Sequence, residues 1–367
     1  MDKKTFNLWN RIVALAVFVV ASVTYLSTIE PTASFWDCGE FIASSYKLEV
    51  GHPPGNPVFQ LFARIFTIPF PPEKAAVAVN AMNGILSALT IFFLYLTTVF
   101  FAKRLVKPGK DGYSVAQAIA IFGSGAVGAL AYTFSDTFWF SAVEGEVYAM
   151  SSLVTALVFW AMCKWYEGAD EPHANRWIVL IAFLMGLSIG IHLLNLLTIP
   201  AFVFMYYYRK NEDRQLPFKQ LVGIFLIGVV IEALLVFLFI PYLPKLAAFF
   251  DRIFVNGFGL PYNSGALFFM VALLVLCFWA LFATLKKDKV FWNTVMLCVT
   301  TLVIGFSLFS IVIIRSSVKT PTNEYQPDNA YTLVRYLSRE QYGSRRSCTA
   351  STSMRRTTSR PANTGRR

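Results

Sequence analysis

Long apolar stretches alternate with short polar segments along most of the chain. A helix needs about 20 apolar residues to cross the hydrocarbon core of a bilayer, and stretches of this length recur. The pattern therefore predicts an all-α polytopic membrane protein with about nine transmembrane helices. The sixth starts near Pro200, and its shortness (about 13 residues) indicates a half-helix or a tilted one. The expected spans cover residues 9–29, 80–102, 115–134, 146–165, 177–195, 196–208, 219–240, 265–285 and 290–314.

Composition agrees with this assignment. Hydrophobic residues make up 56% of the chain, the mean hydropathy is +0.54, and only 14% of residues are charged. A soluble protein averages roughly 25% charged residues. The five cysteines include no C-x-x-C pair, so neither a zinc site nor a disulfide framework is indicated. No small-residue cleavage site precedes Glu30, which favours an uncleaved first span.

Charge sets the expected orientation. If the N-terminus is cytoplasmic, the short loops on the same side are basic, as the positive-inside rule requires. The opposite side then carries residues 30–79, 135–145, 241–264 and everything after 315. The predicted partners include membrane lipids, and no nucleic acid is expected among them. The basic residues of the inner side are Lys103, Arg104, Lys107, Lys110, Lys164, Arg176, Arg209, Lys210, Arg214, Lys219, Lys286, Lys287 and Lys289.

The first outer segment holds the densest group of polar residues. The run FWDCGE occupies residues 35–40, and GHPPG follows at residues 51–55. Residues 58–66 have helical spacing with an apolar bias, which is typical of a helix that lies in the interface. The prolines at 53, 54 and 57 exclude one continuous helix. We therefore expect short interfacial helices around a fixed turn.

Five motifs together resemble a known family. They are DCGEF and GHPPG in the first outer segment, SAVEGEVYA at 141–149, GLSIGIHLLN at 186–195 and REQYG at 339–343. The chain resembles the bacterial family catalogued as domain of unknown function 2723, which is similar to transmembrane protein O-mannosyltransferases. The resemblance covers about residues 8–343. It implies a glycosyltransferase C-type fold and a polyprenyl-phosphate-linked sugar as donor. The implied acceptors are Ser or Thr hydroxyls of exported proteins, at the periplasmic face of a bacterial inner membrane.

The residues suit such a transfer. It needs a base near the acceptor oxygen and cationic or donor groups near the leaving phosphate. Asp37 is the expected base. Glu40, one helical turn further on, is expected to share the proton, orient the acceptor or hold Asp37. His52, Lys47 and Arg64 are the candidates for the phosphate. The alternative is structural: the two acids cap an interfacial helix and the histidine closes a turn.

Two further motifs supply candidate substrate contacts. Glu144 and Glu146 are expected to bind sugar hydroxyls beside Tyr148 and Trp139, or else to act only as acids favoured at a helix start. His192 and Asn195 close the GLSIGIHLLN motif. An intramembrane histidine is costly and faces a bundle interior, so it serves either the donor phosphate or an interhelical hydrogen bond. No metal ligand and no cofactor are assigned.

Two other functions remain open from the sequence. A transporter or lipid-carrier flippase would use Glu232 and His192 at depth, but internal repeats and paired broken helices are not evident. A noncatalytic membrane scaffold is the other. The run GSGAVG at residues 123–128 fits G-x-G-x-x-G, yet it sits in an apolar span with no preceding strand, so close helix packing explains it better.

The expected domains are a transmembrane glycosyltransferase-like part (1–315), the start of an exported segment (316–344) and a tail (345–367). The tail contains seven Arg and nine Ser or Thr, and it has no acidic, large aliphatic or aromatic residue. Such a segment cannot bury enough apolar surface to order itself. We expect a frame-shifted or truncated end on a chain that is weakly active or inactive alone. A genuine basic arm for anionic head groups is the alternative.

Overall fold

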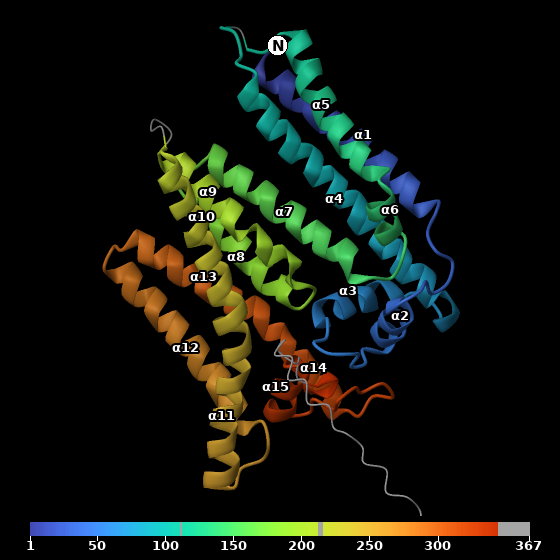
Figure 1. The fold of residues 1–367 in the computed structure, drawn as a ribbon, viewed down its shortest axis with the longest axis vertical. Helices are drawn as coiled ribbons and strands as arrows, with labels where there is room; N and C mark the ends of the chain where they lie inside the picture. The colour runs from blue at the N-terminus through green and yellow to red at the C-terminus, as the bar shows by residue number, and fades with distance from the viewer. Residues whose placement is uncertain (111, 212–215, 344–367) are drawn as a thin grey trace, which may run out of the picture.

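The computed structural model describes residues 1–110, 112–211 and 216–343, and within these ranges the chain forms helices and connecting segments and no β-strand. Figure 1 shows long helices that run side by side, with shorter ones gathered at the end away from the N-terminus. The helices are α1 (Lys3–Leu26), α2 (Cys38–Lys47), α3 (Pro57–Thr67), η1 (Pro72–Lys74), α4 (Ala75–Leu105), α5 (Val115–Thr133), α6 (Asp136–Ala142), α7 (Val147–Glu167), α8 (Arg176–Ile189), η2 (Leu193–Thr198), α9 (Ile199–Lys210), α10 (Phe218–Ala233), η3 (Leu234–Phe239), α11 (Ile240–Phe258), α12 (Ser264–Lys286), α13 (Val290–Phe306), η4 (Ser307–Phe309), α14 (Ser310–Ser317), α15 (Ala330–Leu337) and η5 (Glu340–Tyr342).

Seven helices in the described part of the chain are long and apolar enough to cross a membrane. The prediction of an all-α polytopic membrane protein is therefore confirmed. Two of the nine expected spans differ in form: residues 177–195 and 196–208 fold as α8 of 14 residues, the 3-10 turn η2, and α9 of 12 residues. The break lies at His192, whose backbone is extended (φ −162°) between the two parts.

The seventh expected span is longer than its apolar pattern indicated. The helix continues without interruption from α10 through the π-helical turn η3 into α11 and covers 41 residues. At 1.5 Å per residue this is about 60 Å, twice the thickness of a bilayer core. Residues 241–258, expected as an outer loop segment, are thus mostly helix that extends past the ends of its neighbours, as Figure 1 shows.

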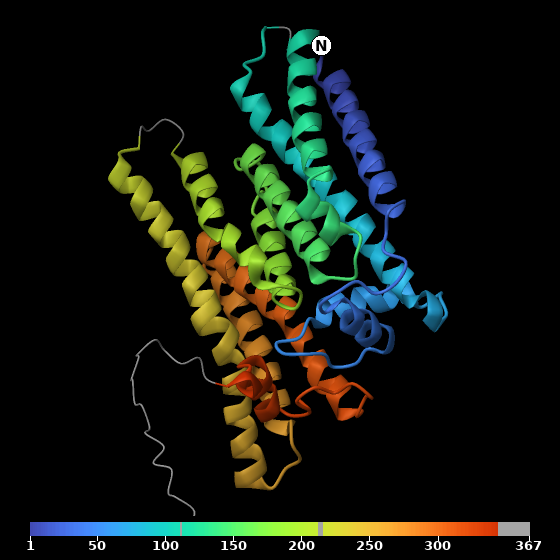
Figure 2. The same cartoon turned by 45° about the vertical axis from the view of Figure 1, so that its right-hand side comes forward.

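The core is divided around α4. One cluster of buried apolar side chains joins α1, α4, α5 and α6, and another joins α4 to α2, α3, α7, α8 and α9. Figure 2 shows α4 running between the two groups of helices. The buried Asn83 of α4 donates to the backbone oxygens of Glu144 and Glu146, at 2.6 Å each, and so fixes the turn before α7. In this way α4 holds the predicted glutamates at one end of the bundle.

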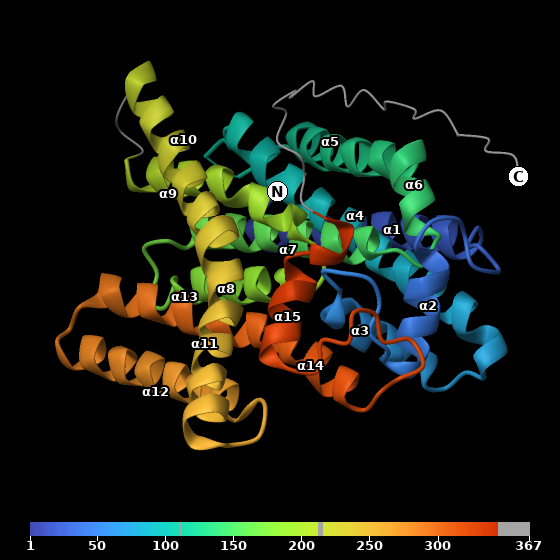
Figure 3. The same ribbon diagram turned by 60° about the horizontal axis from the view of Figure 1, so that its bottom comes forward.

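The last described segment packs against the first outer segment. Figure 3 shows α14 and α15 beside α2 and α3, although about 270 residues separate them in sequence. Arg315 donates to the backbone oxygens of Leu48 (2.6 Å) and Lys47 (3.1 Å), and Val50 pairs with Asn323 in an isolated parallel bridge. Whether residues 316–344 form a separate exported part stays a prediction. The predicted tail, 345–367, lies outside the described residues.

Candidate active site

Two short helices and the turn between them carry the first group of candidate residues. Helix α2 begins directly after Asp37 and ends at Lys47, and the next residue, Leu48, adopts a left-handed conformation (φ 51°). Helix α3 begins at Pro57, in the first turn where proline costs no hydrogen bond. The expectation of short helices around a proline-rich turn is confirmed for these segments. Their depth relative to a membrane stays a prediction.

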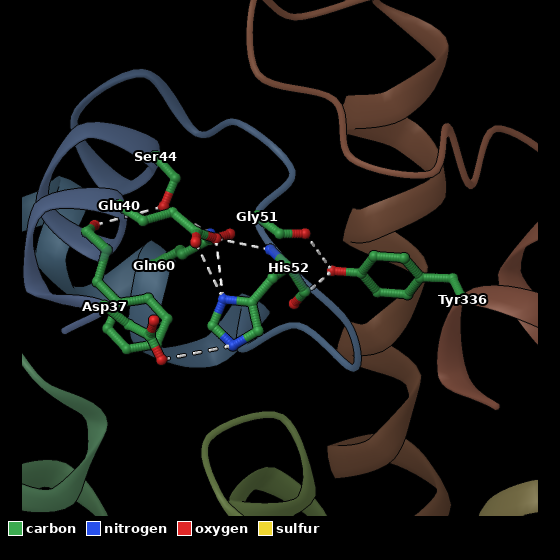
Figure 4. Close-up of polar contacts among 8 residues, drawn as sticks. Asp37, Glu40, Ser44, Gly51, His52, Gln60 and Tyr336 are labelled. Atoms are coloured by element: carbon green, nitrogen blue, oxygen red, sulfur yellow. Dashed lines mark hydrogen bonds and ion pairs between the residues drawn. The ribbon is translucent and has the colours of Figure 1, made fainter. Parts of the chain in front are cut away.

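Asp37, Glu40 and His52 converge at this turn (Figure 4). The Nδ1 atom of His52 lies 3.1 Å from both carboxylate oxygens of Glu40, and the backbone N–H of His52 donates to Glu40 Oε1 at 2.6 Å. The Nε2 atom on the other side of the ring lies 3.8 Å from Asp37 Oδ2. Glu40 thus sets the orientation of the imidazole and turns its other nitrogen toward Asp37.

The carboxylate of Glu40 lies so close to the backbone at position 51 that it restricts the residue there to glycine. A Cβ atom added at Gly51 would lie 2.3 Å from Glu40 Oε1, so only glycine allows the carboxylate to approach the backbone here.

Asp37 occupies the N-cap position of α2, but its side chain makes no capping hydrogen bond and is 56% exposed. Neither acid therefore makes the capping hydrogen bond of the structural alternative, and Glu40 bonds to His52 instead.

Electrostatics couple Glu40 to His52. Burial alone would raise the pKa of Glu40, but hydrogen bonds from the ring and backbone of His52, with the charge of the ring, outweigh it and hold that pKa below its ordinary value. The hydrogen bond to Glu40 raises the pKa of His52 against the opposing effect of burial, and the nearby charges of Glu40, Asp37 and Glu324 act in the same direction. The pair therefore favours a charged imidazolium beside a carboxylate.

Tyr336 of α15 anchors the turn from outside. Its hydroxyl donates to the backbone oxygens of Gly51 (2.7 Å) and His52 (3.2 Å), and its side chain is almost fully buried (Figure 4). Gly55, at φ +76°, packs directly against this hydroxyl. Burial raises the pKa of the Tyr336 phenol, so the hydroxyl keeps its proton and remains a donor.

A cavity of about 340 Å³ opens next to these residues. It brings together five of the residues predicted from the sequence, while Glu40 lies behind His52. Helix α2 and the turn form one wall, the start of α7 a second, and the break between α8 and η2 a third. The candidates that line it are Asp37, His52, Glu146, Tyr148 and His192.

Glu146 is the most perturbed acid in this cavity. Its side chain is only 7% exposed and accepts a hydrogen bond from the N–H of Val147 at 3.2 Å. Burial, reinforced by the charges of Asp37 and Glu144, raises the pKa of Glu146 to about 7 despite that hydrogen bond. Glu146 does cap α7, as the structural alternative has it, but it also presents a group that exchanges its proton near neutral pH.

His192 and Tyr148 both line the cavity and contact each other. Their rings meet edge to face with centroids 5.4 Å apart, and His192 Nδ1 accepts a hydrogen bond from the N–H of Leu194 at 3.2 Å. The hydrogen bond that His192 makes among the described residues is therefore local, not the interhelical bond that was one of its two expected roles. Its other expected role, contact with the donor phosphate, stays a prediction. Glu232, which the transporter alternative requires, lies on α10 and does not line this cavity.

Four predicted candidates lie elsewhere. Lys47 is 4.0 Å from Glu49 at the end of α2, and Arg64 stacks over the Tyr46 ring at 5.0 Å. Asn195 is fully buried and donates to Ser188. Glu144 is buried, and this burial raises its pKa. Trp139, expected beside the glutamates, instead donates to Thr28.

Two residues that sequence reasoning had not assigned belong to the site. Arg339 lines the cavity and carries the only Lys or Arg side chain among its lining residues in the described chain. Tyr336 lies three residues earlier and holds the turn. The REQYG motif pointed to this region without indicating a role. The three side chains of Asp37, Glu40 and His52 also place potential metal-ligand atoms within 4.8 Å of one another, but a metal would have to replace the hydrogen bonds between His52 and Glu40.

Comparison with known proteins points to one family for the segment that contains most of this site. Residues 37–215, just under half of the chain, match the family model described as the N-terminal domain of protein O-mannosyl-transferase TMEM260. The matched segment starts at Asp37 and includes every cavity-lining residue except Arg339. An O-mannosyltransferase-like family is therefore supported. Membership of the family catalogued as domain of unknown function 2723 stays a prediction, and so does a bacterial origin.

Individual relatives carry the same name. The protein O-mannosyl-transferase tmem260 of Dictyostelium discoideum is 25% identical over 211 residues, which cover 54% of this chain and 23% of that protein. The protein O-mannosyl-transferase TMEM260 of Mus musculus is 24% identical over 176 residues, 48% of this chain and 23% of the relative. The matched part thus spans less than a quarter of the length of either relative. No solved structure matches the chain significantly.

Proposed function

We propose that this chain forms the membrane part of a glycosyltransferase that moves a sugar from a polyprenyl-phosphate carrier to a Ser or Thr hydroxyl of an exported protein. The observation that carries the proposal is the cavity that joins Asp37, the His52–Glu40 pair and Glu146. The names of the two relatives support protein O-glycosyl transfer, and the apolar helices suit a donor carried in lipid.

Asp37 is the proposed general base. Its carboxylate borders the cavity, is more than half exposed and makes no capping hydrogen bond, so its oxygens are available to an incoming hydroxyl. The acceptor oxygen attacks the anomeric carbon while the bond from that carbon to the phosphate oxygen breaks. The hydroxyl proton passes to Asp37, and the polyprenyl phosphate leaves with the electron pair of the broken bond.

Glu40 and His52 are proposed to position the base. The two contacts of Glu40 with the histidine ring and backbone fix the imidazole, whose Nε2 faces Asp37. The ring lies 3.8 Å from Asp37 Oδ2 and so constrains where the base can lie. Glu40 therefore acts through His52 rather than by taking the acceptor proton itself.

Arg339 is proposed to bind the phosphate. The leaving group gains negative charge as the sugar departs, and a guanidinium matches phosphate oxygens in a two-pronged geometry. Lys47 and Arg64, the cations expected from the sequence, lie outside the cavity, whereas Arg339 lines it. Glu146, Tyr148 and His192 form the remaining polar wall, which suits sugar hydroxyls.

The cavity is proposed to face the non-cytoplasmic side. It lies at the start of α7 and the end of α8. The opposite ends of these two helices (Figure 1) carry Lys164 and Arg176, which the positive-inside rule assigns to the cytoplasm. An acceptor that has crossed the membrane would reach the cavity from that side, beside the exposed Phe35 and Trp36.

The experiment compares O-linked sugars on exported proteins by mass spectrometry. Cells without the gene should lack a set of hexose-bearing Ser and Thr peptides, and the wild-type chain should restore them. Asp37→Asn, which keeps the volume and removes the base, should insert normally and restore none. Restoration by Asp37→Asn would contradict the role of Asp37, and an unchanged set of glycopeptides after gene removal would contradict the function.

A further inference from the structure

A second cavity lies at the other end of the bundle, near the N-terminus marked in Figure 1. Its volume is about 550 Å³, and none of the candidate catalytic residues lines it. The walls come from the first turns of α1, the last turns of α4 and α7, and the start of α8 with the loop before it. It therefore joins the two halves of the core at the basic ends of the spans.

The charges in this cavity favour an anion. Four cationic residues line it against two acids, Glu167 and Glu171. Glu167 is already paired with Lys103 (3.1 Å) and Lys164 (3.0 Å). The remaining two cations, Lys3 and Arg176, stand on different walls and have no carboxylate partner among the described residues. Glu171 likewise has no ion-pair partner there, so four cations face two acids and the cavity keeps an excess of two positive charges. A ligand that reaches both would compensate charge that the protein leaves unbalanced.

The walls also change character with depth. On α4, Leu96, Val99 and Phe100 lie on the face that ends in Lys103, so apolar side chains line the inner part and a cation lies nearer the helix end. Trp160 and Trp177 meet edge to face, 5.5 Å between centroids, at the boundary. Tryptophan is typical of the membrane–water interface. A ligand with a charged head and an apolar tail suits this gradient better than a soluble ion.

We infer that this cavity binds the phosphate head group of an anionic phospholipid. Lys3 and Arg176 contact the phosphate, and the first part of an acyl chain lies against Leu96 and Val99. Basic pockets between transmembrane helices bind anionic head groups through the same combination of charge and apolar contact. The bound lipid would bridge α1 and α4 to α7 and α8.

The test measures lipid binding and needs no transferase activity. The purified full chain in zwitterionic nanodiscs is titrated with phosphatidylglycerol or phosphatidylcholine, and bound lipid is counted by native mass spectrometry. Phosphatidylglycerol should bind selectively. The double variant Lys3→Gln/Arg176→Gln should lower its affinity by about 30-fold, since each basic residue near a head group contributes about 1 kcal/mol. Lys286→Gln/Lys287→Gln removes the same charge at another helix end on the same side and should change little.

Two further measurements separate lipid from free phosphate. Leu96→Trp should reduce phosphatidylglycerol binding while all four cations remain, because it fills the apolar inner part. Inorganic phosphate should bind far more weakly than the lipid. Equal affinity for inorganic phosphate, or unchanged phosphatidylglycerol binding in the Lys3/Arg176 variant or in Leu96→Trp, would overturn the lipid assignment.

Discussion

The hydroxyl of Tyr336 offers a sharp test of how the site is held together. Tyr336→Phe removes one oxygen atom and leaves the buried ring in place. The loss affects two backbone acceptors, Gly51 O at 2.7 Å and His52 O at 3.2 Å. The oxygen of His52 keeps a second donor, the N–H of Gly55 at 2.9 Å. The oxygen of Gly51 has no other donor among the described hydrogen bonds.

The expected cost follows from this count. A buried carbonyl left without a partner costs about 1–3 kcal/mol, while the weaker bond to His52 is replaceable. We expect the free energy of unfolding to fall within that range and the thermal midpoint in detergent to drop by a few degrees. Because Gly51 and His52 carry the contacts of Glu40, kcat should fall with little change in KM for the donor.

The control is Tyr342→Phe, which removes the same atom from a side chain that is 60% exposed. Thermal unfolding, followed by tryptophan fluorescence, and initial rates are measured for both variants. Equal midpoints and equal kcat for Tyr336→Phe and the wild type would refute the argument that this hydroxyl fixes the turn. An equal loss in both variants would show an unspecific effect of the C-terminal segment.

Three other outcomes are expected. Glu40→Gln removes the main cause that raises the pKa of His52, so activity that needs the imidazolium should be lost at lower pH than in the wild type. Glu324 contributes less to that rise, so Glu324→Gln should shift the pH–rate profile less. Burial raises the pKa of Glu146 to about 7, so its contribution to the free energy of unfolding is full below about pH 4.5 and is lost as pH rises through 7. Glu146→Gln should therefore raise the thermal midpoint at pH 8 and not at pH 4. Equal shifts of the midpoint at both pH values would contradict this. A cysteine at Phe35, 83% exposed, should react with an impermeant reagent from outside while one at Lys287 should not, and the reverse pattern would invert the proposed orientation.

Apolar length and local motifs were enough to predict much of this architecture. Seven spans could be placed because an uninterrupted apolar helix is a local property of the sequence. The break at His192 could not, since apolar residues continue through it and only the backbone changes from helix to extended. The length of the helix through η3 was missed as well: residues 241–264 were expected as an outer segment, yet the helix continues through Pro244 to Phe258.

The candidate site was also predictable only in part from the sequence. Asp37, Glu146 and His192 were recognisable from motifs, because an acid or histidine beside an apolar span is unusual. That Glu40 holds His52 depends on a turn that brings residues 12 apart within 3.1 Å. The absence of Lys47 and Arg64 from the cavity, and the presence of Arg339, depend on where distant helices pack. A single sequence carries no signal for that.

The C-terminal segment belongs to the site for a physical reason that the family match does not contain. The match ends at residue 215, yet Arg315 and Tyr336 donate hydrogen bonds to the oxygens of Leu48 and Gly51. These oxygens lie in the turn that carries His52, and a buried backbone acceptor needs a partner. A chain cut after residue 215 would expose this turn and lose Arg339 as well. The matched segment therefore holds most of the candidate site residues, but the geometry between them depends on residues from 315 onward.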